Sequence, residues 1–188
     1  LEAKNAAELV VVDWAEKQAV VSVSEAQTAP AIYDDIPQNT CYEWALGDSD
    51  AVATAMEQAA HVTRIELTNN RLIPNAMEPR AALAEYNAGS DELTLHTTSQ
   101  NPHLARLILT AFVQIAPEHK LRVIAPDVGG GFGSKIFVYS EETALAWAAK
   151  KLGLTIKWTA ERSEAFLADA HGRDHINCRL HQTNRHRH

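Results

Sequence analysis

Residues 125–135, APDVGGGFGSK, hold four of the eight glycines in the chain, and they are the first place where residue type and spacing could do chemistry. Glycine costs backbone entropy on folding, so it is kept where φ must be positive or where another group must contact the backbone. Consecutive small residues also expose several backbone N–H groups, which together can bind an anion. The segment therefore predicts a tight turn that could hold a negatively charged group.

The two common phosphate-binding motifs do not fit this segment. A P-loop needs G-x-x-x-x-G-K-[ST], but Ser134 stands directly before Lys135 without that spacing. A dinucleotide fingerprint would need glycine at position 134 or 136, where the chain has Ser134 and Ile136. Phe132 inside the loop must either pack inward or face a ligand. From the residues alone, a structural turn with a packed Phe132 and a cofactor contact both stay open.

Two predicted helices and a strand must position the loop. Residues 121–125 predict a buried strand that leads into it. Asn101 as N-cap and Pro102 at the first position begin a helix that extends to residue 115. Its apolar residues follow the helical spacing i, i+3, i+4, i+7: Leu104, Leu107, Ile108, Ala111, Phe112 and Ile115.

The second predicted helix follows the loop. Ser140 is its expected N-cap, acidic residues follow in the first turn, basic residues lie in the last turn, and Gly153 ends it. Glu141 and Glu142 are accordingly interpreted as residues that face the helix dipole.

The remaining patterns predict further strands and one more helix. Residues 82–86 and 92–97 flank a turn and predict a hairpin, 61–67 and 156–159 predict strands, and Asp48 caps a short helix. Strands and helices interleave without a regular βαβ repeat. We therefore expect an α+β fold, a mixed β-sheet with helices packed on it.

Composition limits the functional classes. With 188 residues, 46% hydrophobic and 22% charged, the chain is typical of a soluble globular protein. A net charge of -7 argues against nucleic-acid binding, and no apolar run reaches the ~20 residues of a membrane span. Cys41 and Cys178 lie far apart and form neither a metal motif nor a disulfide framework, so a cytoplasmic location is expected.

The chain is predicted to have three parts. Residues 1–47 are interpreted as a connecting segment with short strands, and 48–176 as the main domain. Residues 177–188 are rich in His and Arg and poor in apolar residues, so we expect a tail that builds no core. A metal site at His181, His186 and His188 is the less favoured alternative to a disordered end.

Five motifs occur in a fixed order along the chain: NAMEPR at 75–80, TSQNP at 98–102, DVGGGFGSK at 127–135, WTAERS at 158–163 and HGRDH at 171–175. In this combination the chain resembles the molybdenum hydroxylase family, which includes xanthine dehydrogenase, aldehyde oxidase and aerobic carbon monoxide dehydrogenase. The resemblance covers roughly residues 1–176 and the start of the molybdenum-cofactor domain of the large subunit. The GGGFGSK and HGRDH spellings resemble the carbon monoxide dehydrogenase branch.

The resemblance implies a cofactor, site residues and partners. Gln100 matches the glutamine whose side-chain amide donates to an oxo ligand of molybdenum, while Gly130, Gly131, Phe132 and Gly133 match the loop that lies against the metal and the pterin. The implied cofactor is molybdenum-molybdopterin cytosine dinucleotide, and the implied partners are an FAD-binding medium subunit and a 2Fe-2S small subunit. For Gln100, a purely structural role at the start of a helix stays equally open.

Two positions limit what can be transferred. Ile136 stands where purine-oxidising members carry a substrate-binding glutamate, so xanthine is not an expected substrate. Arg173 stands where such members carry a substrate-facing arginine, but a structural salt bridge with Asp169 or Asp174 is the favoured reading. Glu78 and Arg80 are interpreted as an ion pair that stabilises a turn, without a catalytic role.

Family large subunits are several times longer than this chain, and their catalytic glutamate and active-site loop lie far downstream. No catalytic residue and no metal ligand is therefore assigned here. We expect a fragment of a large subunit that is inactive alone, holds no cofactor by itself and forms a homo-oligomer through an uncovered apolar face. The alternative is a stand-alone, catalytically silent binding or interaction module.

Overall fold

The structure is a computed structural model that describes residues 2–183, and the chain divides into two compact units. Unit 1 combines the residues up to 68 with those from 175 onward, and unit 2 comprises residues 69–174. These limits differ from the expected division at residues 47 and 176. The reason is that β1 (His61–Asn69), which belongs almost entirely to unit 1, pairs with β6 (His175–Thr183), far away in sequence.

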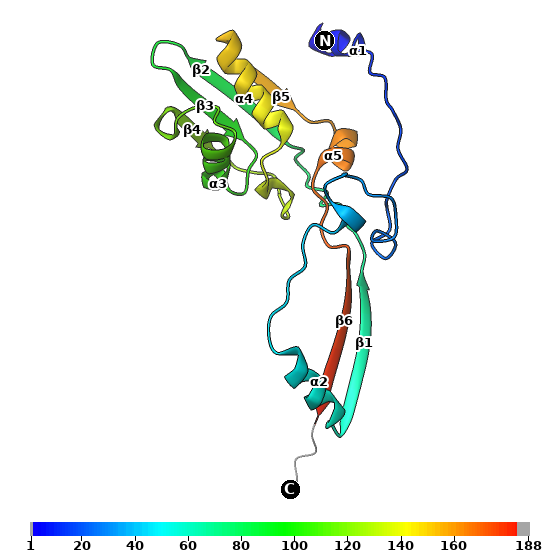
Figure 1. Cartoon of the computed structure of the whole chain (residues 1–188). Helices are drawn as coiled ribbons and strands as arrows, with labels where there is room; N and C mark the ends of the chain where they lie inside the picture. Colours follow the sequence, from blue (N-terminus) through cyan, green and yellow to red (C-terminus); the bar gives the residue numbers. More distant parts are fainter. Residues whose placement is uncertain (1, 184–188) are drawn as a thin grey trace. The chain divides into compact units, whose positions relative to one another are not determined.

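Unit 1 contains this two-stranded sheet, short helical elements and long connecting segments (Figure 1). It contains the helices α1 (Glu2–Glu8) and α2 (Ser49–Glu57) and the short 3-10 turn η1 (Pro37–Asn39). Asp48 caps α2 as expected, since its Oδ1 accepts hydrogen bonds from the backbone N–H groups of Asp50 and Ala51 at 3.1 and 2.9 Å. Across residues 2–183, every helix is too short or too polar to span a lipid bilayer.

Strand β6 corrects the expectation of a structureless tail. Residues 177–183 form most of this strand, although they are mainly polar. Strands β1 and β6 are exposed along nearly their whole length, so neither needs the apolar alternation that marks a strand covering a core. His181 lies in β6, while His186 and His188 lie outside the described residues. Among the described residues, no group of His, Cys, Asp and Glu is arranged to hold a metal ion.

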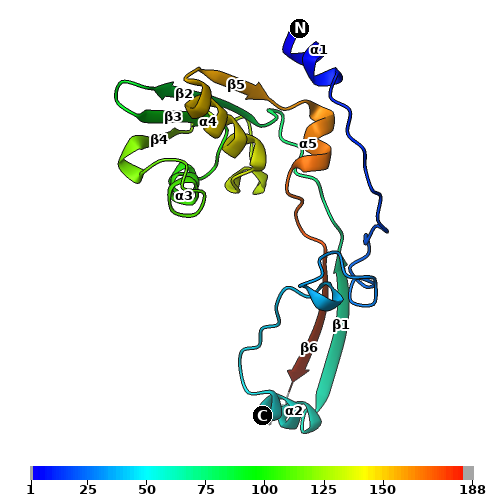
Figure 2. The same ribbon diagram turned by 45° about the horizontal axis from the view of Figure 1, so that its top comes forward.

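Unit 2 is built on a four-stranded sheet in the order β4-β3-β2-β5. The strands are β2 (Ala81–Asn87), β3 (Glu92–Thr97), β4 (Leu121–Ile124) and β5 (Ile156–Thr159). Strand β2 is antiparallel to both β3 and β5, whereas β3 and β4 are parallel, so the sheet is mixed (Figures 1 and 2). The expected α+β class and the predicted hairpin are therefore confirmed.

Helices pack on this sheet, and the hydrophobic core lies between the helices and the strands. Helix α4 (Ser140–Leu152) packs against β2, β3 and β5, and α3 (Pro102–Leu107) packs against β4. The other helical elements of unit 2 are the π-helical turn η2 (Ile108–Phe112), the 3-10 turns η3 (Glu118–Lys120) and η4 (Ser134–Ile136), and α5 (Arg162–Ala168). The buried core is the cluster Ala82, Ala84, Leu93, Leu95, Leu109, Ala116, Leu121, Leu145, Ala146 and Ala149.

The helix predicted from residue 101 to 115 differs from expectation. Asn101 is its N-cap, with Oδ1 accepting from the Leu104 N–H at 3.3 Å, but after Leu107 the chain widens into η2. Leu107 and Phe112, predicted to be buried, are 52% and 76% exposed, while Leu109 is fully buried. The helix contacts the core through Ala105 and Leu109, four residues apart, and the pattern of large apolar residues missed the small Ala105.

Helix α4 begins one residue earlier than expected. Its N-cap is Tyr139 instead of Ser140, and the Glu142 Oε2 accepts a hydrogen bond from the Tyr139 N–H at 3.0 Å. Gly153 ends the helix in a left-handed conformation with φ of 66°, as predicted. Glu142 is therefore the residue that caps α4, and it does so from a buried position.

Replacing Leu95 by alanine tests the core of unit 2. Leu95 is 1% exposed, so Leu95→Ala should lower the free energy of unfolding by about 2–5 kcal/mol. Leu167, which is 88% exposed, supplies the matched control, and Leu167→Ala should change stability by less than about 0.5 kcal/mol. Urea unfolding followed by circular dichroism measures both; equal losses would contradict the core described above.

Candidate functional site

The glycine loop lies between β4 and η4 in unit 2 and is a strained turn. Gly130 and Gly133 have φ of 94° and 92°, a region that side-chain-bearing residues rarely adopt. Phe132 between them also has a positive φ of 52°. Positive φ at a bulky residue is a marked exception, and such exceptions gather at ligand-binding sites.

Gly131 is glycine because of Gln100. A Cβ built on Gly131 would lie 2.5 Å from the Gln100 Cδ and 2.6 Å from its Cγ. Gln100 thus contacts the loop backbone, although it comes from the segment between β3 and α3. The predicted site residues Gln100, Gly131 and Gly133 are therefore brought together in space.

The orientation of the Gln100 amide is determined by its bond to the loop. The Gly133 N–H donates to Gln100 Oε1 at 2.9 Å, and a backbone N–H can donate only to the carbonyl end of an amide. The Nε2 group of Gln100 has no hydrogen-bond acceptor within the described residues. Gln100 therefore bonds the glycine loop and not the N–H groups at the start of α3, where Asn101 is the cap. Its contact with a ligand stays a prediction.

Two backbone N–H groups of the loop are also without acceptors. The N–H of Gly129 donates to Glu78 Oε2 at 2.7 Å, and that of Gly130 donates to the Val128 carbonyl at 2.9 Å. In the part of the chain that the structure describes, the N–H groups of Gly131 and Phe132 have no hydrogen-bond acceptor, and Gly131 is a buried residue. A buried donor without a partner costs free energy, about 1–3 kcal/mol, so these donors are suited to an external acceptor.

Phe132 does not pack into the core. Its side chain is 73% exposed and leans over Gly130, where an added Cβ would lie 2.9 Å from the ring Cε2. The interpretation in which Phe132 packs inward is therefore wrong, and its contact with a ligand stays a prediction. Phe132 also borders a cleft of 660 Å³ lined by Asn75, Met77, Glu78, Gly129, Gly130 and Phe132.

The opposite wall of this cleft, residues 75–77, is held by Arg162 at the start of α5. Its Nη1 donates to Asn75 Oδ1 at 2.8 Å and to the Ala76 carbonyl at 2.6 Å, and its Nη2 donates to the Met77 carbonyl at 2.7 Å. The guanidinium fork is well suited to fixing several oxygens at once. The WTAERS motif is thereby linked to the NAMEPR motif.

Arg80, which directly precedes β2, is completely buried. Its guanidinium donates to Asp169 at 2.6 Å and to both carboxylate oxygens of Glu141 at 3.2 and 3.3 Å. The ring of Tyr139 lies 3.7 Å from its Cζ. Burial alone would lower the pKa of Arg80, but the two carboxylates outweigh it and raise the pKa. The predicted ion pair between Glu78 and Arg80 is therefore wrong: Arg80 pairs with Glu141 and Asp169, and Glu78 pairs with Lys135.

The acidic pair at the start of α4 has two different environments. Burial raises the pKa of Glu141, but the hydrogen bonds and charge of Arg80 prevail and lower it. Burial dominates at Glu142 and raises its pKa, although the Tyr139 N–H and the Thr97 hydroxyl donate to its carboxylate. Both side chains therefore do more than face the helix dipole.

Tyr139 connects the start of η4 to the segment after α5. Its hydroxyl donates to the Ser134 carbonyl at 2.6 Å and accepts from the Ala170 N–H at 2.9 Å. Burial raises the pKa of this hydroxyl, so it stays protonated and able to donate. The loop region and the segment that begins the HGRDH motif are thus joined through a single side chain.

Arg173 makes neither of the salt bridges expected for it. Asp169 pairs with Arg80 at 2.6 Å, and Asp174 pairs with Arg71 at 2.8 Å. Arg173 has a positive φ of 71°, and its Nη1 donates to Asn69 Oδ1 at 3.4 Å. It is not among the residues that line the cleft beside the glycine loop.

Comparison with known proteins identifies the architecture. The family described as "Molybdopterin cofactor-binding domain" matches residues 32–179. The chain belongs to this family.

Relatives of known name agree with this assignment. The chain is 32% identical over 187 residues to the carbon monoxide dehydrogenase large chain of Afipia carboxidovorans, covering 92% of this chain and 23% of that protein. It is 31% identical over 173 residues to the nicotine 6-hydroxylase large subunit of Paenarthrobacter nicotinovorans, covering 92% and 21%. A solved Cu,Mo-CO dehydrogenase structure superposes with a TM-score of 0.86 at 30% identity, over 97% of this chain and 24% of that one.

The extent of the match differs from the lengths of the relatives and from the limit that the motifs indicated. The chain spans about a quarter of the length of the curated relatives it matches. The family match also reaches residue 179, beyond the limit near residue 176 that the motifs indicated, and so includes the first part of β6.

Sequence reasoning missed the residues that hold this site together. Lys135 and Arg162 each make two or more hydrogen bonds to residues 75–78, and Tyr139 joins Ser134 to Ala170, but the sequence pattern assigned no role to these three side chains. The signal available was modest: Lys135 directly follows the loop, and Arg162 lies inside a family motif. A cation next to a glycine turn can hold the backbone of a neighbouring segment through its carbonyl groups, as Lys135 does with the Glu78 carbonyl.

Hydrogen exchange of the chain without ligand tests which loop donors are free. We expect the amides of Gly131 and Phe132 to exchange at least about tenfold faster than those of Leu109 and Ala149, which lie in helical hydrogen-bonded core segments. The amide of Gly133, bonded to Gln100, should exchange more slowly than those of Gly131 and Phe132, and Gln100→Ala should abolish that difference. Equal protection across residues 131–133 would show that the loop is a closed structural turn.

Proposed function

We propose that the chain contributes one wall of a molybdopterin cofactor site in the large subunit of an oxidoreductase related to carbon monoxide dehydrogenase and xanthine dehydrogenase. The proposed contacts are Gln100, Gly130, Gly131, Phe132 and Gly133. The observation that carries the proposal is the set of free donors at one turn: the Gly131 and Phe132 N–H groups and the Gln100 amide. The cofactor when bound would supply the redox chemistry of the metal.

The donors of this turn fit such a group. Neutral N–H donors bind an anion or a metal-bound oxygen without bringing a charge of their own, and glycine lets a ligand approach the backbone. The Gly133 N–H would hold Gln100 Oε1, which leaves the Nε2 group of Gln100 as the donor to the ligand. Phe132, 73% exposed at the cleft, could cover an aromatic part of the ligand, such as a pterin ring.

No catalytic base is proposed for this chain. The carboxylate beside the loop, Glu78, is occupied by the Gly129 N–H and the Lys135 ammonium, which leaves it poorly placed to take a proton. Ile136, 36% exposed, cannot bind a polar substrate group, which argues against a purine substrate. Arg173 stays a weak proposal for substrate contact, because it is not part of the cleft lining. By itself the chain is proposed to be inactive and to retain no cofactor through purification.

Added cofactor should slow exchange at the loop. With the cofactor extracted from a molybdenum enzyme, the amides of Gly131 and Phe132 should exchange at least about threefold more slowly than without it. Gly131→Ala should abolish the effect, since its Cβ displaces Gln100. Gly172→Ala is the matched control, because a Cβ there meets nothing within 4 Å. Unchanged exchange in the wild-type chain would overturn the proposed function in favour of a silent interaction module.

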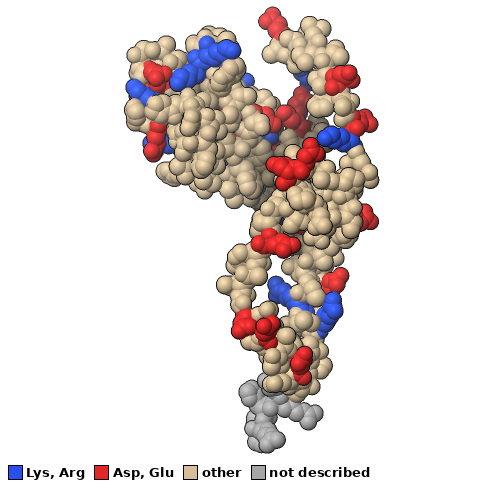
Figure 3. Space-filling view, viewed as in Figure 1, with Lys and Arg blue, Asp and Glu red and all other residues tan. Residues whose placement is uncertain are grey.

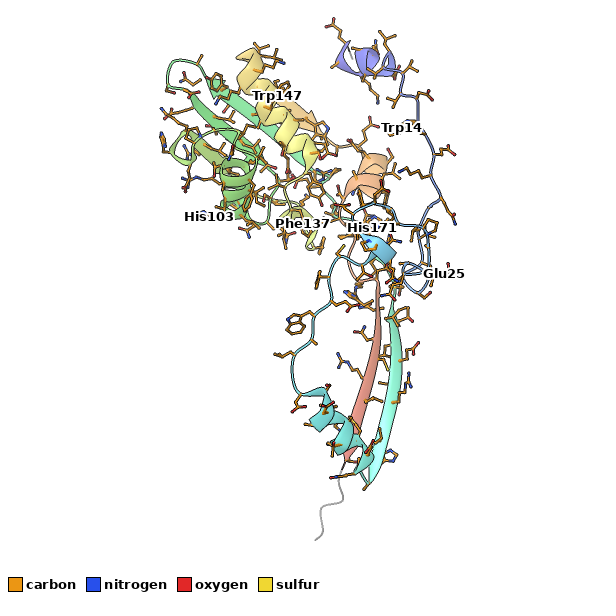
Figure 4. The ribbon with its side chains drawn as sticks, viewed as in Figure 1. Trp14, Glu25, His103, Phe137, Trp147 and His171 are labelled. Atoms are coloured by element: carbon orange, nitrogen blue, oxygen red, sulfur yellow. The ribbon has the colours of Figure 1, made fainter. Side chains whose placement is uncertain are left out.

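Assembly is a further part of the proposal. The implied FAD and 2Fe-2S partners stay proposals, as does a cytoplasmic location, which rests on two free cysteines. Unit 2 has an apolar groove of 690 Å³ whose lining includes Ile108, Val113, Ile115, Val138 and Trp147. In Figure 3 the middle of unit 2 carries few charged atoms, which gather at its upper and left edges, and Figure 4 labels Trp147 on α4. Uncovered apolar surface of this kind promotes association.

A homodimer or larger homo-oligomer is therefore expected in solution. Light scattering at several protein concentrations measures the mass. Trp147→Glu should shift the mass towards that of the monomer, because it places a charge in the groove, whereas Trp14→Glu, at an exposed position in unit 1, should not. A wild-type chain that stays monomeric at high concentration would contradict this expectation.

A further inference from the structure

Lys135 is a buried cation that the proposed function does not use. Its side chain is 1% exposed, and its Nζ donates to the Glu78 carbonyl at 2.8 Å and to Glu78 Oε2 at 3.2 Å. Burying an ammonium group is costly unless it is paired and hydrogen-bonded. Glu78 supplies both a backbone and a side-chain acceptor, so the two residues form one structural pair.

The same carboxylate oxygen also holds the glycine loop. Glu78 Oε2 accepts from the Gly129 N–H at 2.7 Å, and the Glu78 N–H donates to the Gly129 carbonyl at 3.2 Å. The two backbones are so close that a Cβ on Gly129 would lie 2.5 Å from the Glu78 Cβ. Residues 75–80 and the loop, which form the two walls of the cleft, are therefore joined at this point.

This contact decides which loop donors are available. Because Glu78 accepts from Gly129, the first N–H of the turn is satisfied, and those of Gly131 and Phe132 remain without acceptors among the described residues. A carboxylate beside an anion-binding turn would by itself repel an anion. Lys135 lies within hydrogen-bond distance of that carboxylate and offsets its charge from the buried side.

We propose that Lys135 and Glu78 are positioning residues of the glycine loop: Lys135 fixes and neutralises the Glu78 carboxylate, which in turn holds Gly129 so that the Gly131 and Phe132 N–H groups stay open to an anionic cofactor. This inference rests on the proposed function for the identity of the ligand. The arrangement of the loop by the pair does not depend on any ligand.

The first arm of the test measures hydrogen exchange in the chain without cofactor. Glu78→Ala should make the Gly129 amide exchange about tenfold faster, because its charge-assisted acceptor is lost. Glu78→Gln keeps an oxygen acceptor and should stay within about threefold of wild type. Both variants remove the carboxylate partner of the buried Lys135 but keep its bond to the backbone carbonyl of residue 78, and thermal melting checks that each variant is folded. Equal exchange in the two variants would overturn the proposal.

Lys135 is tested in the same way, with a matched lysine as control. Lys135→Met should make Gly129 exchange about tenfold faster, since the carboxylate is then free to turn towards solvent. Lys150 also bridges a backbone carbonyl and a carboxylate in unit 2, with Nζ 3.2 Å from the Ile115 oxygen and 3.7 Å from Asp91 Oδ1. Lys150→Met should leave Gly129 unchanged; an equal effect of both variants would show a general loss of stability.

The second arm adds extracted molybdenum cofactor and tests the charge. The apparent affinity for the cofactor is measured from the slowing of exchange at Gly131 and Phe132. Lys135→Met should lower this affinity about tenfold, and the double variant Lys135→Met with Glu78→Gln should recover most of the lost affinity. No restoration would overturn charge neutralisation. If the cofactor does not change exchange at the loop of the wild-type chain, the proposed function is wrong. The exchange rate of the Gly129 amide in the variants still decides whether Lys135 and Glu78 position the loop. If Lys135→Met does not fold, the Glu78 pair of variants decides alone.

Discussion

A fully buried arginine is the constraint on which unit 2 depends. Arg80 precedes β2, and its guanidinium binds Glu141 at the start of α4 and Asp169 after α5, with the ring of Tyr139 packed on it. A buried charge that loses its partner typically costs about 3–5 kcal/mol. The sheet, the main helix and the segment after α5 must therefore meet at one point. The cleft walls are built outward from there, because Glu78 is two residues before Arg80 and Tyr139 reaches Ser134 in the loop region.

The glycines of the loop are explained first by contacts within the chain. Gly129 accommodates Glu78 and Gly131 accommodates Gln100, whereas Gly130 and Gly133 are needed for their positive φ. The loop is thus rigidly connected to two other segments before any ligand is considered. A turn preorganised in this way loses little conformational freedom when a ligand binds, which favours affinity.

Helix caps and turns could be predicted from neighbouring residues, whereas features that depend on tertiary contacts could not. Asp48, Asn101 and Gly153 were recognisable because caps act through neighbouring residues. The strand β6 was missed because a largely exposed ribbon has no apolar pattern. The exposure of Leu107 was not predicted, because the π-helical turn and the small Ala105 change which face of the helix contacts the core. At the site, the resemblance pointed to Gln100 and the loop, which do meet. The partners of Arg80, Lys135 and Arg162 lie 57 to 89 positions away and leave no local pattern.

The close approach of Gln100 to Gly131 and of Glu78 to Gly129 also restricts how this region can change during evolution. A larger residue at position 131 is sterically compatible only with a shorter one at position 100. At position 129 the contact is with the Cβ of Glu78, so a larger residue there would require glycine at position 78 or a shift of the backbone. Drift at these sites is therefore possible only in coordinated pairs, and the two pairs are independent of each other because they share no atoms. Covariation between positions about 30 and 50 residues apart would then record the backbone contact itself, whatever substrate each descendant acquires.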